Sequence, residues 1–199
     1  MIAGLFVGLS RLISGASVRW VDCRPDPRQR IYFANHTSHL DFVVIWSALP
    51  PAARGMTRPV AGSDYWERGR LRRYLVSRVF NALLIDRERV TAHNNPIDRV
   101  VGALDEGYSL ILFPEGTRGD GEIGPFKSGL YHICTRKAGV ELVPVYLENL
   151  NRVLPKGESL PVPVLSSVTF GPPMVLNTGE SKPAFLERAR AAVLSLRQS

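Results

Sequence analysis

The stretch PIDRVVGALDEGYSLILFPEGTR, residues 96–118, decides the fold class. Its proline opens a helical pattern whose apolar residues share one face, and Gly107 is placed to end that helix. SLILF, residues 109–113, then gives the strongest strand signal in the chain, and a polar, glycine-rich loop follows it. A helix, a buried strand and a polar loop in this order are typical of α/β proteins.

The same alternation continues on both sides of this stretch. Further strands are predicted at residues 31–35, 58–62, 83–86, 140–147 and 166–171. Helical patterns lie between them, starting near Ser38, Tyr65, Lys127 and Lys182, and the second of these extends to Ala82. The order predicts an α/β fold in which helices flank a mainly parallel central sheet. With 199 residues, 45% of them apolar, one domain over residues 1–199 is expected.

The net charge narrows the class of partner, and the cysteine content bears on the compartment and on metal binding. The 25 Lys and Arg exceed the 18 Asp and Glu by seven, so the surface favours anionic partners. Nucleic acid is not expected among them, because the sequence has no helix-turn-helix, zinc pattern or aromatic platform. The two cysteines are isolated from each other and suggest a reducing compartment without a metal site.

The first twenty residues, MIAGLFVGLSRLISGASVRW, predict an amphipathic helix over residues 1–20. Ten residues precede Arg11, about half of the roughly 20 needed to cross a bilayer. The segment has neither a basic start nor a cleavage site, so it is expected to stay in the mature protein. Two roles are open for its apolar face, packing on the core or lying in the membrane interface.

NHTSHLD, residues 35–41, follows the first predicted strand and is a candidate catalytic segment. Open α/β sheets build their sites where strands end. Imidazole is a suitable base near neutral pH, and a carboxylate can fix its tautomer, so His36 and Asp41 are candidates for a base and its partner. Two alternatives are that Asp41 only caps a helix, and that His36 and His39 bind a metal. The backbone N–H groups after Thr37 are candidates for stabilising an oxyanion.

FPEGTR, residues 113–118, and the loop GDGEIGPFKSG after it have the composition of a phosphate site. Glycine lets backbone N–H groups approach an anion, Arg118 offers a planar fork, and Lys127 adds a mobile charge. The alternative is a solvated polar turn. Arg87, just after the strand at residues 83–86, would reach the same edge of a parallel sheet.

The order NHTSHLD, LLIDR, FPEGTR and VPVYL resembles the glycerolipid acyltransferases, most closely the 1-acylglycerol-3-phosphate (lysophosphatidate) O-acyltransferase family. The resemblance spans about residues 30–148 and is carried mainly by the His-x4-Asp block and FPEGTR. It implies that His36 acts as general base and that Asp41 orients it. It further implies that a set of residues contacts the phosphate-bearing acceptor, namely Arg87, Glu115, Gly116, Thr117, Arg118 and, more weakly, Lys127.

The function expected from this resemblance is transfer of a fatty acyl group from a thioester to a lysophospholipid hydroxyl, most of all lysophosphatidate. The donor would be acyl-coenzyme A or acyl carrier protein, used as a co-substrate with no cofactor or metal. An anionic membrane surface is the expected location, at its cytoplasmic face, with peripheral or monotopic attachment. The alternatives are another lipid acceptor, a lipid hydrolase that uses the same two residues, and a noncatalytic lipid-binding module.

Overall fold

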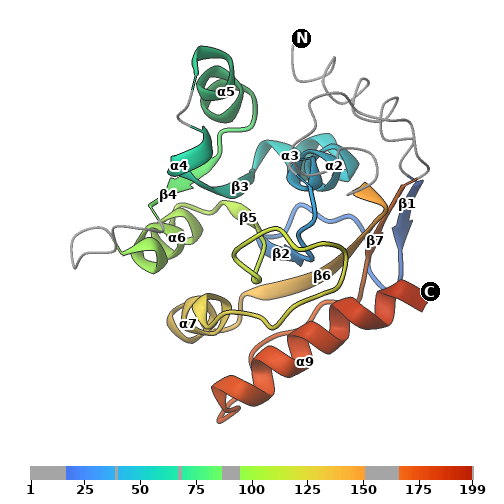
Figure 1. Cartoon of the computed structure of the whole chain (residues 1–199). Helices are drawn as coiled ribbons and strands as arrows, with labels where there is room; N and C mark the ends of the chain where they lie inside the picture. The colour runs from blue at the N-terminus through green and yellow to red at the C-terminus, as the bar shows by residue number, and fades with distance from the viewer. Residues whose placement is uncertain (1–16, 39, 67–68, 87–94, 151–165, 199) are drawn as a thin grey trace.

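The computed structural model of the chain describes residues 17–38, 40–66, 69–86, 95–150 and 166–198. At its centre is a seven-stranded sheet with the order β1-β7-β6-β2-β5-β3-β4 (Figure 1). The strands are β1 Ser17–Trp20, β2 Arg30–Ala34, β3 Thr57–Gly62, β4 Leu83–Ile85, β5 Ser109–Leu112, β6 Glu141–Glu148 and β7 Ser167–Phe170. Only the β6–β7 pair is antiparallel among these strand pairs. The predicted α/β fold with a mainly parallel sheet is confirmed.

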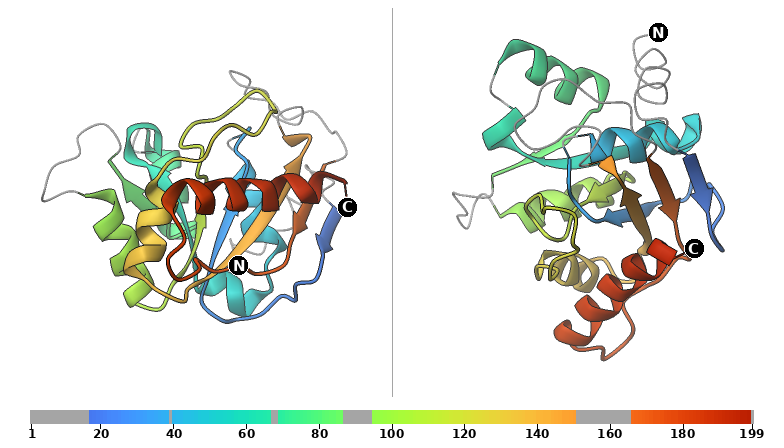
Figure 2. Two further views of the ribbon diagram at one scale, coloured as in Figure 1. Left: turned by 90° about the horizontal axis from the view of Figure 1, so that it is seen from below. Right: turned by 45° about the vertical axis from the view of Figure 1, so that its right-hand side comes forward.

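Helices lie on both faces of the sheet (Figures 1 and 2). The described α-helices are α2 Asp41–Ala48, α3 Pro51–Gly55, α4 Ser63–Trp66, α5 Arg70–Tyr74, α6 Pro96–Asp105, α7 Gly129–Arg136 and α9 Lys182–Ser195. A π-helix, η1 Leu75–Val79, follows α5, and a 3-10 helix, η2 Leu196–Gln198, follows α9. Helices α6, α7 and α9 cover one face, and α2 covers the other.

Apolar residues of β2 point alternately to the two faces. Ile31 and Phe33 pack in the cluster under α6, α7 and α9, whereas Tyr32 and Ala34 pack in the cluster under α2. All four side chains are buried, because a central strand of a covered parallel sheet has no solvent face. This is why the central strands read as continuous apolar runs in the sequence.

Local signals place the ends of several helices. Asn95 caps α6 by accepting a hydrogen bond from the Ile97 N–H at 2.9 Å, and Ser181 caps α9 through the Ala184 N–H at 3.4 Å. Gly107, with φ of 89°, follows α6 in the left-handed conformation. The sequence prediction for α6 is therefore confirmed at both ends.

Two helix predictions are wrong in part. Residues 17–20 form strand β1, which pairs with β7, and not the end of an amphipathic helix; the rest of that predicted helix, residues 1–16, lies outside the described residues. The helix predicted over residues 65–82 is divided into the short elements α4, α5 and η1. A four-residue apolar repeat is shared by one long helix and by several short ones, so it did not reveal the breaks. No helix in the described part of the chain is both long and apolar enough to cross a membrane.

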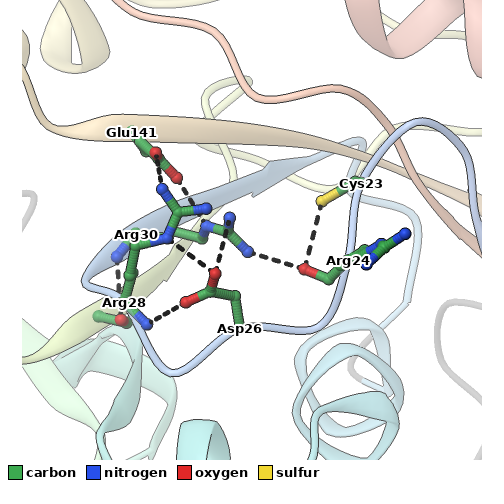
Figure 3. A network of polar contacts seen from close by, with 7 residues as sticks. Cys23, Arg24, Asp26, Arg28, Arg30 and Glu141 are labelled. Atoms are coloured by element: carbon green, nitrogen blue, oxygen red, sulfur yellow. Dashed lines mark hydrogen bonds and ion pairs between the residues drawn. The ribbon is translucent and has the colours of Figure 1, made fainter.

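An ion-pair network joins β2 and β6 at their amino-terminal ends (Figure 3). Arg30 and Glu141 are register partners, and Arg30 Nε donates to Glu141 Oε2 at 2.8 Å. Arg30 Nη1 also donates to the Arg24 carbonyl at 3.0 Å, and Arg28 bonds both Asp26 and Glu141. These bonds compensate the burial of the Arg30 guanidinium, so both strands are fixed at the edge opposite to the site described next.

Candidate active site

A cavity of about 500 Å³ lies at the carboxyl edge of the sheet, where β2, β3, β4 and β5 end. Apolar side chains from β3, β4, β5, α6 and α7 line its interior, among them Val60, Ile85, Ile97, Leu112, Leu130 and Ile133. Its polar lining includes His36, Thr117, Arg118 and Lys127. One cavity thus has an apolar interior together with an imidazole and two cationic side chains.

His36 and Asp41 meet as the sequence predicts. His36 follows β2, Asp41 is the first residue of α2, and Nδ1 of the imidazole lies 2.8 Å from Asp41 Oδ2. Since a buried carboxylate accepts hydrogen bonds, this pairing assigns the hydrogen to Nδ1 and leaves Nε2 as the basic nitrogen. The His36 side chain is 20% exposed and lines the cavity, whereas Asp41 is fully buried.

Asp41 also organises the backbone between β2 and α2. Its Oδ2 accepts hydrogen bonds from the N–H groups of Thr37 at 2.7 Å and Ser38 at 2.9 Å. This carboxylate therefore orients the imidazole and also holds the turn before α2. The alternative that it only caps the helix is not what the structure shows, because Thr37 and Ser38 precede α2 and its N-cap residue, Leu40, has no side-chain cap hydrogen bond. Among the N–H groups after Thr37, which the sequence offered as oxyanion donors, that of Ser38 is already bonded to Asp41.

Two side chains that the sequence did not identify hold His36 in place. The ring of Phe113 stacks on the imidazole with centroids 4.1 Å apart and planes 20° apart. Asn35 bonds both backbone groups of Leu147 on β6, at 2.9 Å to the carbonyl and 2.8 Å to the N–H. Both residues lie in the motifs quoted above. In a sequence, however, an apolar or amide residue at a strand end looks the same whether it only packs in the core or also supports a catalytic side chain.

The loop from β5 to α7, residues 113–128, carries the predicted phosphate-binding groups. Gly116 has φ of 73°, and a Cβ built on it would lie 2.8 Å from Lys127 Nζ, so the ammonium group lies directly over this glycine. Gly116, Thr117, Arg118 and Lys127 all line the cavity. The structure brings these four predicted residues together with His36. The cations and the left-handed glycine are suited to an anion.

Glu115 has a different role from the predicted substrate contact. Its Oε1 accepts from the His36 N–H at 2.8 Å, and its Oε2 accepts from the Gly124 N–H at 2.9 Å. The residue is 9% exposed and does not line the cavity. Because backbone groups occupy both oxygens, Glu115 holds the β5–α7 loop against His36. The motif spacing could not show which way this carboxylate points.

Two predicted residues lie outside the described part of the chain, Arg87 and His39. Strand β4 ends at Ile85, which lines the cavity two positions before Arg87. Within the described residues, no three His, Cys, Asp or Glu side chains are grouped as metal ligands.

A family model described as Acyltransferase matches residues 18–148, about two thirds of the chain. The chain belongs to this acyltransferase family. It is 31% identical over 156 residues to a 1-acyl-sn-glycerol-3-phosphate acyltransferase of Limnanthes alba, covering 74% of this chain and 50% of the relative. An Escherichia coli protein of the same name is 32% identical over 137 residues, covering 62% and 51% respectively. The chain therefore spans about half the length of these curated relatives.

The fold is also similar to a solved structure. The crystal structure of the 1-acyl-sn-glycerophosphate (LPA) acyltransferase PlsC from Thermotoga maritima superposes with a TM-score of 0.76. The match covers 99% of this chain and 79% of that chain at 20% identity. At this identity the likeness shows the fold and supports the sheet described above.

Replacing Glu115 with Gln tests its positioning role. Glutamine keeps one oxygen but turns an NH₂ group toward one of the two N–H donors, so the free energy of unfolding should fall by about 1–3 kcal/mol. Acyl transfer should fall at least roughly tenfold, because His36 loses a backbone anchor. Glu122→Gln is the matched control, since that side chain is in the same loop and 81% exposed. Thermal melts and initial rates that match for the two variants would contradict this role.

Proposed function

We propose that this family member transfers a fatty acyl group from a thioester to the free hydroxyl of a lysophospholipid. The observation that carries the proposal is the His36 imidazole, oriented by Asp41 at 2.8 Å, at the wall of a cavity that is cationic in one part and apolar in another. The relatives are named 1-acyl-sn-glycerol-3-phosphate acyltransferases, so lysophosphatidate is the proposed acceptor and phosphatidate the product.

The proposed reaction is a direct transfer. Nε2 of His36 takes the proton from the acceptor hydroxyl, and the oxygen attacks the thioester carbonyl. The carbon–sulfur bond then breaks, and the leaving thiolate takes the proton back from the imidazolium, which Asp41 stabilises meanwhile. A cysteine nucleophile is not needed, and burial raises the pKa of Cys134 to about 12, which keeps that thiol protonated.

The two parts of the cavity suit the two ends of a lysophospholipid or an acyl donor. Arg118 provides a planar guanidinium and Lys127 a mobile ammonium group for the acceptor phosphate, beside the backbone of Gly116. The side chains from α6, α7 and the strand ends provide an apolar lining for a fatty chain. The proposed donor is acyl-coenzyme A or an acyl carrier protein, and it acts as a co-substrate.

The proposed location is an anionic membrane surface on the cytoplasmic side. The segment of α5 and η1, residues 70–79, projects beyond the β3–β4 end of the sheet and follows α4, whose Trp66 lines the cavity (Figure 1). Its sequence has no acidic residue, and it exposes basic side chains and Tyr74, which is 46% exposed. Exposed basic and aromatic side chains on α5 and η1 suit contact with anionic headgroups.

Replacing His36 with Ala or Asp41 with Asn should lower kcat by at least about 100-fold, since the base is lost or its tautomer is no longer fixed. Product formation from lysophosphatidate and acyl-coenzyme A or acyl carrier protein, followed by mass spectrometry, measures this. Circular dichroism and thermal melts establish that the variants are folded. A folded His36→Ala protein with normal turnover would exclude the mechanism, and lipid binding without turnover in the wild type would favour a binding module.

Arg118→Ala should raise KM for lysophosphatidate roughly tenfold or more, because a charge-assisted contact with phosphate is lost. The rate with a monoacylglycerol, which has the hydroxyl and no phosphate, should change little. Arg136→Ala is the control, since this exposed arginine on α7 pairs with Asp98 instead. Equal losses with both acceptors would remove the proposed phosphate contact.

Changing three arginines of α5 and η1 whose exposure the structure describes to Gln should weaken binding to anionic vesicles roughly 100-fold, at about 1 kcal/mol for each charge. The variant is Arg70→Gln, Arg73→Gln and Arg78→Gln. A control with the same charge change on helices α6, α7 and α9 is Arg99→Gln, Arg136→Gln and Lys182→Gln. Vesicle flotation at low salt compares them, and equal flotation of the two variants would contradict contact through α5 and η1.

A further inference from the structure

We infer that Arg190, on α9, is a positioning residue for His36 although it lies outside the matched family region, residues 18–148. The inference rests on the proposed function, because it assigns Arg190 a part in the reaction of the same site. It is carried by a continuous series of hydrogen bonds that begins on α9 and ends at the backbone of His36.

The backbone of His36 is bonded on both sides to the β5–α7 loop. The His36 N–H donates to Glu115 Oε1 at 2.8 Å, and the His36 carbonyl accepts from the Gly119 N–H at 2.8 Å. With Asp41 on the imidazole, these bonds determine where the base sits. Movement of the loop therefore moves His36.

The peptide group between Ile123 and Gly124 connects that loop to α9. The N–H of Gly124 donates to Glu115 Oε2 at 2.9 Å, and the carbonyl of the same peptide, on Ile123, accepts from Arg190 Nη2 at 2.9 Å. Arg190 Nε lies 3.2 Å from this carbonyl and 3.2 Å from the Gly124 carbonyl. The positive guanidinium and the negative carboxylate thus bind opposite ends of one peptide dipole, an arrangement in which each bond strengthens the next.

Helix α9 is a rigid origin for this series. Phe185, Ala189 and Val193 on its inner face are fully buried against the sheet and α7. The guanidinium of Arg190 is a planar fork, so it fixes the direction as well as the distance of the loop carbonyls. Residues 123 and 124 are consequently held in one place relative to the core, and the loop transmits that placement to His36.

Arg188 provides a matched control on the same helix. It is 36% exposed, close to the 30% of Arg190, but its guanidinium bonds both oxygens of Glu180 and the Val175 carbonyl, away from the loop. Replacing Arg188 with Ala removes an equal side chain and three hydrogen bonds, whereas Arg190 makes three bonds to the loop and one to Glu187 on its own helix. Any effect common to both variants is therefore an effect on α9 and not on the loop.

The test compares Arg190→Ala, Arg190→Lys and Arg188→Ala in the full chain, with lysophosphatidate and an acyl thioester. Arg190→Ala should lower kcat roughly 10- to 100-fold, because displacement of a catalytic group by about 1 Å has effects of this size. Arg190→Lys should recover part of this loss, and Arg188→Ala should retain kcat within about twofold at a similar or larger loss of Tm. Amide hydrogen exchange at residues 36, 119 and 124 should become faster in Arg190→Ala only.

Two outcomes would overturn the inference. One is a wild-type kcat for folded Arg190→Ala, and the other is equal losses of kcat in Arg190→Ala and Arg188→Ala. Failure of the proposed function would look different, because the wild type itself would then transfer no acyl group. Amide hydrogen exchange would still be faster in Arg190→Ala, and this would show that Arg190 holds the backbone of His36 in place.

Discussion

The site depends on a buried carboxylate that has three donors on one oxygen. Asp41 is fully buried, and a charge in that position is retained only if hydrogen bonds replace its lost hydration. Its Oδ2 receives them from His36, Thr37 and Ser38 within 2.9 Å. These bonds require the chain to fold back over the start of α2, so the turn between strand and helix and the orientation of the imidazole have the same cause. Oδ1 has no hydrogen-bond partner among the described residues, so the compensation is concentrated on one side of the group.

The strand order determines what surrounds this carboxylate. Strand β2 lies between β5 and β6, and its parallel neighbour β5 ends at the same edge. The residues after β2 and β5, some 80 positions apart in the sequence, are thereby adjacent, and β3 and β4 extend the same edge to form the apolar part of the cavity. A parallel arrangement thus brings a base, cations and an apolar lining together without a dedicated domain.

The sequence predicted every described strand except β1, the sheet type and the meeting of His36 with Asp41, because buried runs, caps and motif spacing have local signatures. It also predicted that Gly116, Arg118 and Lys127 gather at one edge, since parallel strands place their following loops together. It did not predict that Glu115 points away from the cavity or that the Thr37 N–H is bonded to Asp41. Side chains in an irregular loop follow no repeating pattern, so their direction cannot be derived from sequence spacing. Arg190 was missed for a related reason. Its helix is amphipathic and charged like many others, and only the folded chain places it against the loop.

The ion pair at the far edge of the sheet has its own consequence for how this molecule can tolerate change. Arg30 joins β2 to β6 at the start of the strand, and Asn35 joins the same two strands just after its end. A strand secured to its neighbour at both ends cannot slide along it, and a slip by one residue would exchange the side chains of the two faces. We therefore expect substitutions that alter core volume to be accommodated by outward shifts of the covering helices, while the distance along the sheet from β6 to the imidazole stays constant.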